Sequence, residues 1–187
     1  MPEPRLIQMD NLGRLNKGRL WVNQLPFRIE TQAKVFAGSF ESPHSISASA
    51  FQLCLELKLM PRDANYYGLL GFEFTPTSSK TSFFEITYLE RLGNFLNDNI
   101  LSFKLNEVHI GIPKEFVEPI AGALQEMNEK LELPVGKYSF ITSAHGEVGS
   151  SGIVYRKIVS ILFLLVSKNA ITFDSETLKS IIANELK

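Results

Sequence analysis

The stretch Val108–Leu133, VHIGIPKEFVEPIAGALQEMNEKLEL, constrains the fold more than any other part of the chain. It predicts a short strand that turns at Gly111 into an amphipathic helix. Pro113 suits the first helical position because its φ is already helical and its missing N–H would have no intrahelical partner there. Apolar residues then recur every three or four positions on one face: Phe116, Ile120, Leu124, Met127 and Leu131. We therefore expect a helix over 113–131 that covers a sheet.

Alternation of period two over Phe51–Leu59 predicts a strand of that sheet. Its odd positions are all apolar, so one face lies in the core and the other in water; the even positions are Gln52, Cys54, Glu56 and Lys58. Similar alternation predicts three further strands, Tyr66–Thr75, Phe83–Tyr88 and Lys137–Ser143. We therefore expect an α+β fold, in which a mostly antiparallel four-stranded sheet carries two helices on one face.

The second helix is expected over 151–167, with Ser150 or Ser151 as its cap. Its body is apolar almost all round, so another element must cover it. We expect a C-terminal helix within Asp174–Lys187 to pack there, with a homodimer contact through helix 151–167 as the alternative. The apolar run Ile158–Val166 is too short to span a bilayer.

These elements divide the chain into three parts. Residues 1–42 form an N-terminal extension, residues 43–168 form the main domain with an insertion at about 89–107, and residues 169–187 form the C-terminal helix. Two short strands are expected in the first part, Leu20–Val22 and Phe27–Phe36.

Composition favours a cytoplasmic protein. The net charge of the 187 residues is −1, so no global field draws the chain to nucleic acid or to an anionic membrane. Cys54 is the single cysteine, which excludes an intramolecular disulfide and a paired-cysteine metal site. It lies within an alternating strand without a basic neighbour, so we do not expect a nucleophile. The N-terminus does not read as a secretion signal.

The order and spacing of several motifs resemble domain IV of elongation factor G and of its relatives, the ribosomal-protection tetracycline-resistance proteins. The resemblance covers residues 43–168 and is carried by YYGLLGFEFTP at 66–76, FFEI at 83–86, GIPKEFVEPIAGALQEM at 111–127 and VGSSGIVYRKI at 148–158. In that family an Ile-Pro-Lys-Glu segment opens the first long helix and a pair of serines opens the second. The resemblance implies a left-handed β-α-β crossover, against the usual right-handed preference.

The chain departs from that family where activity is concerned. It contains no GxxxxGK[ST] pattern, so GTP hydrolysis is not expected. The family's first tip loop is glycine-rich and basic, whereas the corresponding loop 61–67 has Arg62 as its only fixed cation. The second tip loop, 144–149, places His145 beside the position of the family's histidine, which Gly146 occupies.

Both loops leave the sheet at the same end, and loops held together by a rigid sheet commonly form binding sites. Four residues form the expected site: Arg62, Tyr66, His145 and Glu147. They offer one cation, one aromatic face and a His/Glu pair, which suits recognition better than catalysis. We therefore expect a non-catalytic binding module for a protein or ribonucleoprotein partner, the ribosome among the candidates, without cofactor, metal, free nucleotide or membrane.

An enzyme is the alternative, because small-molecule kinases and dehydratases use the same left-handed fold. Segment 145–152, with three glycines ahead of a helix, would then bind a phosphate. The spacing of these glycines fits neither the dinucleotide nor the P-loop pattern. His44 and His109 lie at strand edges without acidic partners at ligand spacing, so no metal site is expected. A solvated loop histidine is the simpler interpretation of His145.

Overall fold

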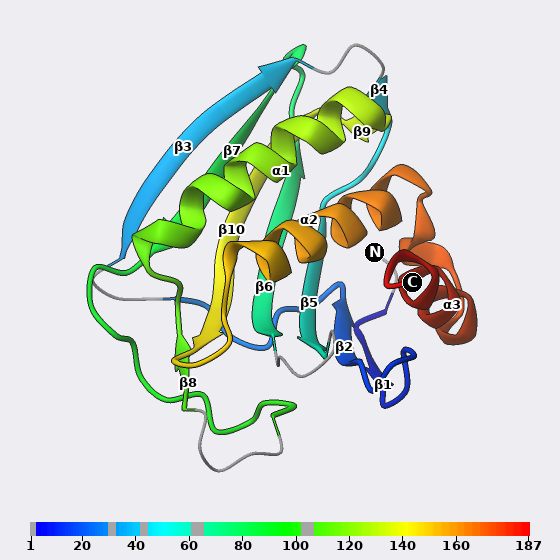
Figure 1. Cartoon of the computed structure of the whole chain (residues 1–187). Helices are drawn as coiled ribbons and strands as arrows, with labels where there is room; N and C mark the ends of the chain where they lie inside the picture. Colours follow the sequence, from blue (N-terminus) through cyan, green and yellow to red (C-terminus); the bar gives the residue numbers. More distant parts are fainter. Residues whose placement is uncertain (1–2, 30–32, 42–44, 61–65, 102–106) are drawn as a thin grey trace.

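The computed structural model describes residues 3–29, 33–41, 45–60, 66–101 and 107–187. Across these residues the fold is α+β, with one open, mixed sheet of eight strands and three α-helices (Figure 1). The strands of this sheet are β1 (Arg5–Met9), β2 (Lys17–Val22), β3 (Lys34–Glu41), β5 (Phe51–Leu59), β6 (Tyr66–Pro76), β7 (Thr81–Tyr88), β8 (Val108–Ile110) and β10 (Gly136–Gly146). The helices are α1 (Val117–Lys130), α2 (Gly152–Ser167) and α3 (Ser175–Glu185).

Neighbouring strands follow the order β1-β2-β5-β6-β10-β7-β3, and β8 also pairs with β10. All these pairs are antiparallel except β7–β10, which is parallel. Two short strands, β4 (Ser45–Ile46) and β9 (Leu133–Pro134), pair with each other at the far end of α1. The α+β class is thus confirmed, and α1 and α2 lie on one face of the sheet (Figure 1).

The expected four-stranded sheet is too small. The four expected strands do share one sheet, but β1 and β2 extend it beyond β5, and β3 extends it beyond β7. The short N-terminal strands join the sheet because Ile7, Leu20 and Val22 complete the same buried core. The expected strand Phe27–Phe36 is wrong, since β3 begins only at Lys34 and runs to Glu41.

The main core lies between the sheet and the helices. Phe72 lies near its centre, with ring contacts to Phe51, Tyr138, Phe140 and Phe163. α2 is buried almost all round, and α3 packs against it through Leu178 and Ile182, which join the same core. None of the helices in the described part of the chain is long and apolar enough to cross a membrane.

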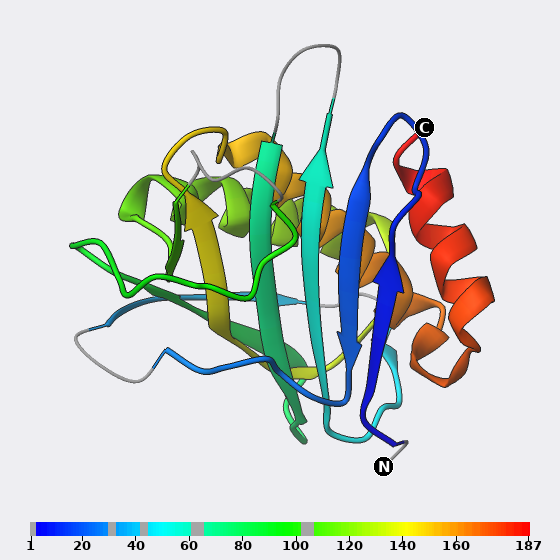
Figure 2. The same ribbon diagram turned by 90° about the horizontal axis from the view of Figure 1, so that it is seen from below.

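The opposite face of the sheet, the back face, is covered as well. Residues 23–29 and 89–101 run across the strands on the side away from the helices (Figure 2). Side chains from these segments pack on a second apolar cluster that includes Trp21, Cys54 and Tyr67. The expectation that the even positions of β5 face water is therefore wrong for Cys54, Glu56 and Lys58, which are all buried.

The helix expected over 113–131 begins later than the sequence suggests. Pro113 stays extended, and a 3-10 turn over Lys114–Phe116 precedes α1. Pro119 falls in the first turn of α1, where its missing N–H removes no intrahelical hydrogen bond. Residues 111–116 therefore connect β8 to α1, and β8 pairs with the end of β10.

Candidate functional site

One end of the sheet brings together segments that are far apart in the sequence. β5 ends there, β6 begins there, and β10 leaves there for α2 (Figure 1). The backbone N–H of Tyr67 donates to Gly149 O at 3.3 Å, and the Ser150 hydroxyl donates to Tyr67 O at 2.7 Å. We call this end the tip and define it by its described segments, 66–67, 107–109 and 145–153.

The expected site residues that the structure describes differ in their exposure to solvent. Arg62 lies outside the described residues. Tyr66 begins β6 and packs, half-buried, against the main core. His145 lies within β10 and is only 8% exposed, so it is not a solvated loop residue. Glu147 follows the strand and is 45% exposed, but its described partner is His109, whose Nε2 lies 3.2 Å from Glu147 Oε1.

Strand pairing explains why His109 belongs to the tip. In the antiparallel ladder between β8 and β10, His109 lies directly opposite His145. The Glu147 N–H donates to Glu107 O at 3.0 Å, which extends the same ladder. Residues two apart on a strand share a face, so two cross-strand pairs stand together. We call them the His–Glu cluster: Glu107, His109, His145 and Glu147.

A β-bulge in β10 decides which face this cluster occupies. The register against β6 shifts between Phe140 and Thr142. Before the shift, Tyr138 and Phe140 belong to the core beneath the helices, whereas after it Ala144 belongs to the back-face cluster. The extra residue of a bulge reverses the alternation of faces beyond it. His145 consequently faces the helices, where its ring centroid lies 6.4 Å from that of Phe116.

Residues 93–96 pair with the backbone of β8 and contact the His109 imidazole. The Leu96 N–H donates to Val108 O and the Ile110 N–H donates to Asn94 O, both at 2.8 Å. Phe95 covers the imidazole with ring centroids 4.7 Å apart, and Gly93 O lies 3.0 Å from Nδ1. A carbonyl oxygen can only accept, so Nδ1 carries the proton and donates. The expectation that His109 lacks acidic partners is therefore wrong in the folded chain.

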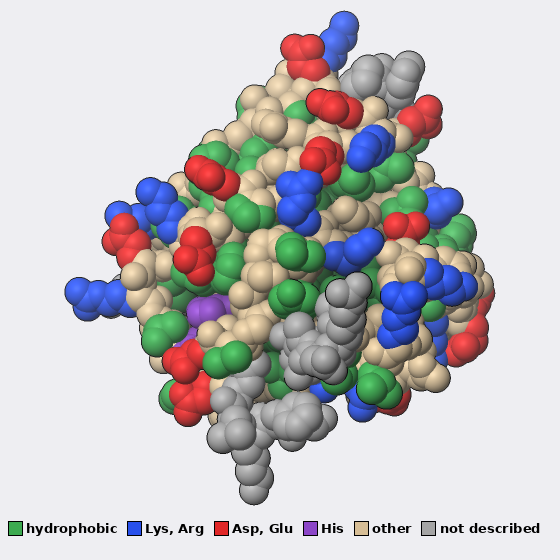
Figure 3. Space-filling view, in the orientation of Figure 1, with side chains coloured by type: hydrophobic (Ala, Val, Ile, Leu, Met, Phe, Trp, Pro, Cys, Tyr) green, Lys and Arg blue, Asp and Glu red, His purple; other side chains and the backbone are tan. Residues whose placement is uncertain are grey.

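The electrostatics of the cluster are uneven. Burial lowers the pKa of His145, and the neighbouring His109 acts in the same direction, while Nδ1 of His145 is held 2.7 Å from Gly111 O. One ligand atom each from Glu107, His109 and Glu147 lies within 4.8 Å of the others. Histidine surface lies next to acidic side chains on the helix-covered face (Figure 3). Such a group can bind a cation or share a proton.

The sequence carried a signal that pointed to this arrangement. The two segments read Glu-x-His at 107–109 and His-x-Glu at 145–147, a complementary pattern for an antiparallel pair. Each pattern is common alone, and only their pairing makes a site. His109 was missed because its acidic partners were sought at nearby positions in the sequence.

A second polar cluster lies on the back face. Glu56 is fully buried and accepts from Arg19 Nε at 2.5 Å, from the Tyr67 hydroxyl at 2.7 Å and from the Ile100 N–H at 3.1 Å. The other two guanidinium nitrogens of Arg19 donate to the side chain and backbone oxygens of Asp98. We call this group the Arg19–Glu56 cluster.

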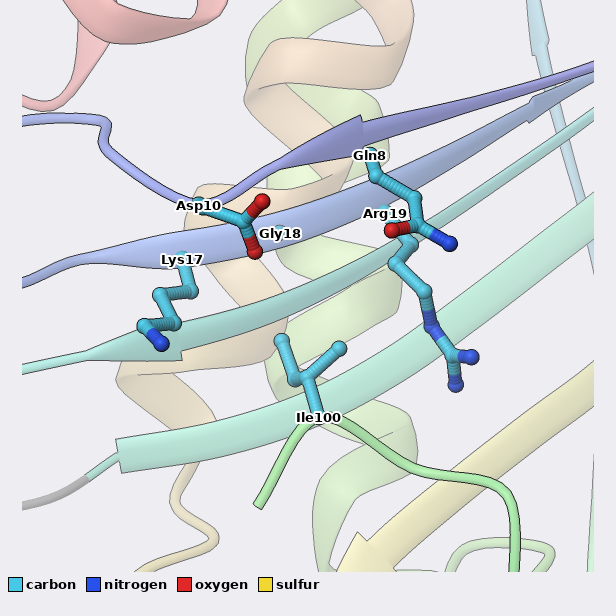
Figure 4. A pocket seen from close by; sticks show the side chains of 6 residues that line it. All are labelled: Gln8, Asp10, Lys17, Gly18, Arg19 and Ile100. Carbon is cyan, nitrogen blue, oxygen red and sulfur yellow. The ribbon is translucent and has the colours of Figure 1, made fainter. Parts of the chain in front are cut away.

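A pocket of about 180 Å³ opens beside the Arg19–Glu56 cluster (Figure 4). Its lining is Gln8, Asp10, Lys17, Gly18, Arg19 and Ile100. All three guanidinium nitrogens of Arg19 already donate to Glu56 or Asp98, so its charge is neutralised within the protein. We interpret this region as structural rather than as a ligand site.

Two backbone N–H groups at the start of segment 145–152 already donate within the protein and are not free to bind a phosphate. The Gly146 N–H donates to the Ser150 hydroxyl at 2.9 Å, and the Glu147 N–H donates to Glu107 O. A phosphate near Glu147 would also meet carboxylate charge. These contacts weigh against a phosphate beside Gly146 and Glu147, and the enzyme alternative stays a prediction.

Comparison of the chain with protein-family models, with curated proteins and with solved structures finds no match. Its function must therefore be inferred from its own residues.

Proposed function

We propose that this protein is a non-catalytic binding module that contacts a protein or ribonucleoprotein partner, with the ribosome as the first candidate, through its tip. One observation carries the proposal. The backbone of Tyr67 is hydrogen-bonded on both its N–H and its C=O to residues 149–150, so the start of β6 and the β10–α2 connection form one rigid unit. A preorganised surface loses little entropy when it binds.

The resemblance to domain IV of elongation factor G is part of this proposal. The parallel neighbours β7 and β10 are connected through α1, which crosses the helix-covered face. In Figure 1 both strands run downward, α1 lies in front of them, and β10 lies to the right of β7. This placement supports the left-handed crossover that the resemblance implies. It runs against the general right-handed preference, which makes the likeness more specific.

The described surface of the tip suits contacts with protein more than contacts with phosphate. Val148 and Ile153 are 69% and 64% exposed there. Segments 66–67, 107–109 and 145–153 contain Glu107 and Glu147 but neither Lys nor Arg. Counterion release from phosphates is then small, so binding to a ribonucleoprotein should depend weakly on salt. We infer that the partner surface is mainly protein.

Co-sedimentation with purified ribosomes at two salt concentrations tests this proposal. The tip variants are Val148→Asp and Ile153→Asp, and the matched control is Val35→Asp, since Val35 on β3 is 55% exposed. Each tip variant should weaken binding at least about tenfold, because a buried aliphatic contact contributes about 1.5–3 kcal/mol. The control should bind as the unaltered chain does.

The outcomes separate the tip from its partner. Loss of binding in both tip variants, with unchanged unfolding midpoints, supports the proposal. Equal binding by all variants would assign the contact to another surface, such as segment 14–28, which contains four Lys or Arg residues and no Asp or Glu. Absence of sedimentation by the unaltered chain would exclude the ribosome. His145 is a poor probe, because it is buried and a substitution would also disturb folding.

A further inference from the structure

The His–Glu cluster has a chemistry that the proposed binding role does not use. We propose that Glu107, His109 and Glu147 bind a divalent transition-metal ion, for which Zn²⁺ is the probe, and leave one coordination position open. The ligand atoms come from β8 and from the two chain segments next to the ladder, and they lie within 4.8 Å of one another. The inference is independent of the partner proposed for the tip.

His109 is held as metal-binding histidines usually are. Its Nδ1 donates to Gly93 O at 3.0 Å, and Phe95 packs on the ring with centroids 4.7 Å apart. The side chain is 5% exposed, so the ring has little freedom. A hydrogen bond from one ring nitrogen to a carbonyl sets the tautomer and directs the other nitrogen, here Nε2, at the ion. The surrounding fold thus prepares Nε2 as a ligand.

The distance between the His109 and Glu147 ligand atoms fits a shared ion. His109 Nε2 lies 3.2 Å from Glu147 Oε1. Ligands at about 2.0–2.1 Å from a tetrahedral Zn²⁺ lie about 3.3 Å from each other. In the neutral tautomer both atoms present lone pairs, so at this separation they need a cation or a proton between them. A proton would satisfy His109 and Glu147 as an ion pair but would give Glu107 no role.

The charges of the cluster also favour a cation. Glu107 and Glu147 are neighbours across the ladder, and like charges in that position destabilise a strand pair. Within the described part of the chain, no Lys or Arg forms an ion pair with either carboxylate. A divalent ion would neutralise both carboxylates at once, while neutral His109 adds no charge.

The ligand types select the class of ion. Mg²⁺ and Ca²⁺ are bound by oxygen ligands, whereas an imidazole favours Zn²⁺ and other transition metals. Three protein ligands leave a fourth position for water or for a side chain of a partner. Glu107 and Glu147 are both exposed, so solvent reaches the cluster. His145 stands beside His109, with ring centroids 5.8 Å apart, and is not assigned as a ligand.

Isothermal titration of Zn²⁺ into the full chain, after treatment with a chelator, tests the site. One ion per chain should bind, and Ca²⁺ and Mg²⁺ should bind far more weakly. Glu107→Gln and Glu147→Gln should each weaken Zn²⁺ binding by at least about tenfold, since even outer-shell changes cost ten- to a hundredfold. Glu129→Gln, an exposed position at the far end of α1, is the control and should bind as the unaltered chain does.

NMR of the imidazole nitrogens provides a readout at the ligand itself. On addition of Zn²⁺, the His109 Nε2 resonance should shift, and in Glu147→Gln the shift should require a higher Zn²⁺ concentration. Absence of Zn²⁺ binding would overturn the proposal and leave an ion pair between His109 and Glu147. Binding that survives both Glu→Gln substitutions undiminished would also overturn it. Neither result bears on ribosome binding, which is measured without added Zn²⁺.

Discussion

The two polar clusters of this protein both contain glutamates next to basic or imidazole side chains, but they differ in burial and in charge balance. Both join strand residues to the segment 89–101, one cluster on each face of the sheet. Glu56 is fully buried and accepts from three donors, with the charge of Arg19 directly against it. Within the His–Glu cluster, the two carboxylates lie near the imidazole of His109, and Glu147 is 45% exposed. A buried carboxylate whose charge is paired stabilises the fold, whereas partly exposed carboxylates without a paired cation can bind a ligand.

The burial of Glu56 affects its neighbours in the way expected of a structural cluster. Burial raises the pKa of Cys54, and the charge of Glu56 raises it further. The same two causes raise the pKa of Tyr67, whose hydroxyl donates to Glu56. Cys54 therefore stays a thiol at neutral pH and is a poor nucleophile. Arg19 also lies over the Trp21 ring, 4.9 Å from its centroid, which stabilises the cation where it is.

The largest effect is expected from Glu56→Ala. It leaves Arg19 buried without its main counter-charge, and such a loss costs about 3–5 kcal/mol of unfolding free energy. Urea denaturation followed by circular dichroism measures the change. Asp98→Asn is the control, because the Asp98 side chain is 87% exposed and its pair with Arg19 should contribute at most about 1 kcal/mol. A loss below about 1 kcal/mol for Glu56→Ala would mean that the cluster is not structural.

Gly93→Ala should affect both regions through the segment they share. A Cβ at Gly93 would overlap the carbonyl oxygen of Ile110, and overpacking of this kind costs about 1–3 kcal/mol. It should also move Gly93 O away from His109 and weaken Zn²⁺ binding. Leu92→Ala is the control, because Leu92 is 63% exposed. Unchanged stability and unchanged Zn²⁺ affinity would show that the close contact between Gly93 and the Ile110 carbonyl does not position His109.

Tyr67→Phe removes one of the three donors to Glu56 and leaves the others in place. The expected loss is about 1–2 kcal/mol, since a hydrogen bond to a charged group contributes somewhat more than a neutral one. The same variant keeps the Tyr67 backbone contacts that tie the tip together. Thermal unfolding should therefore shift while ribosome binding does not. A change in binding without a change in stability would link the Arg19–Glu56 cluster to the tip.

The smallest effect is expected from Glu147→Gln without metal. If the carboxylate serves a bound ion, its loss should change the unfolding free energy in a chelator by less than about 0.5 kcal/mol. The sign should favour the variant, because a like charge beside Glu107 is removed. Urea denaturation of both proteins in a chelator measures the difference. A loss of more than about 1 kcal/mol would place the His109–Glu147 pair in the structural class of Glu56.

Local periodicity determined the elements that form the core of this protein. Alternation located β5, β6, β7 and the first half of β10, and the apolar stripe located α1, because faces that repeat every two or 3.6 residues are a property of neighbouring positions. The class of the fold follows from the order of these elements. The domain IV resemblance goes further and remains a prediction.

Only the tertiary structure decided how the remaining surfaces are used. β1 and β2 are short, and their addition to the sheet next to β5 through β2 depends on burial of Ile7 and Val22 in a core formed by distant residues. The sequence pattern predicted that the back face of β5 is exposed to solvent, but side chains of residues 89–101 pack on it. The bulge in β10 turned His145 to the helix face, and the ladder set it opposite His109, 36 positions away. Register between distant strands is a collective outcome of packing, so no local pattern could have placed Glu107, His109 and Glu147 together.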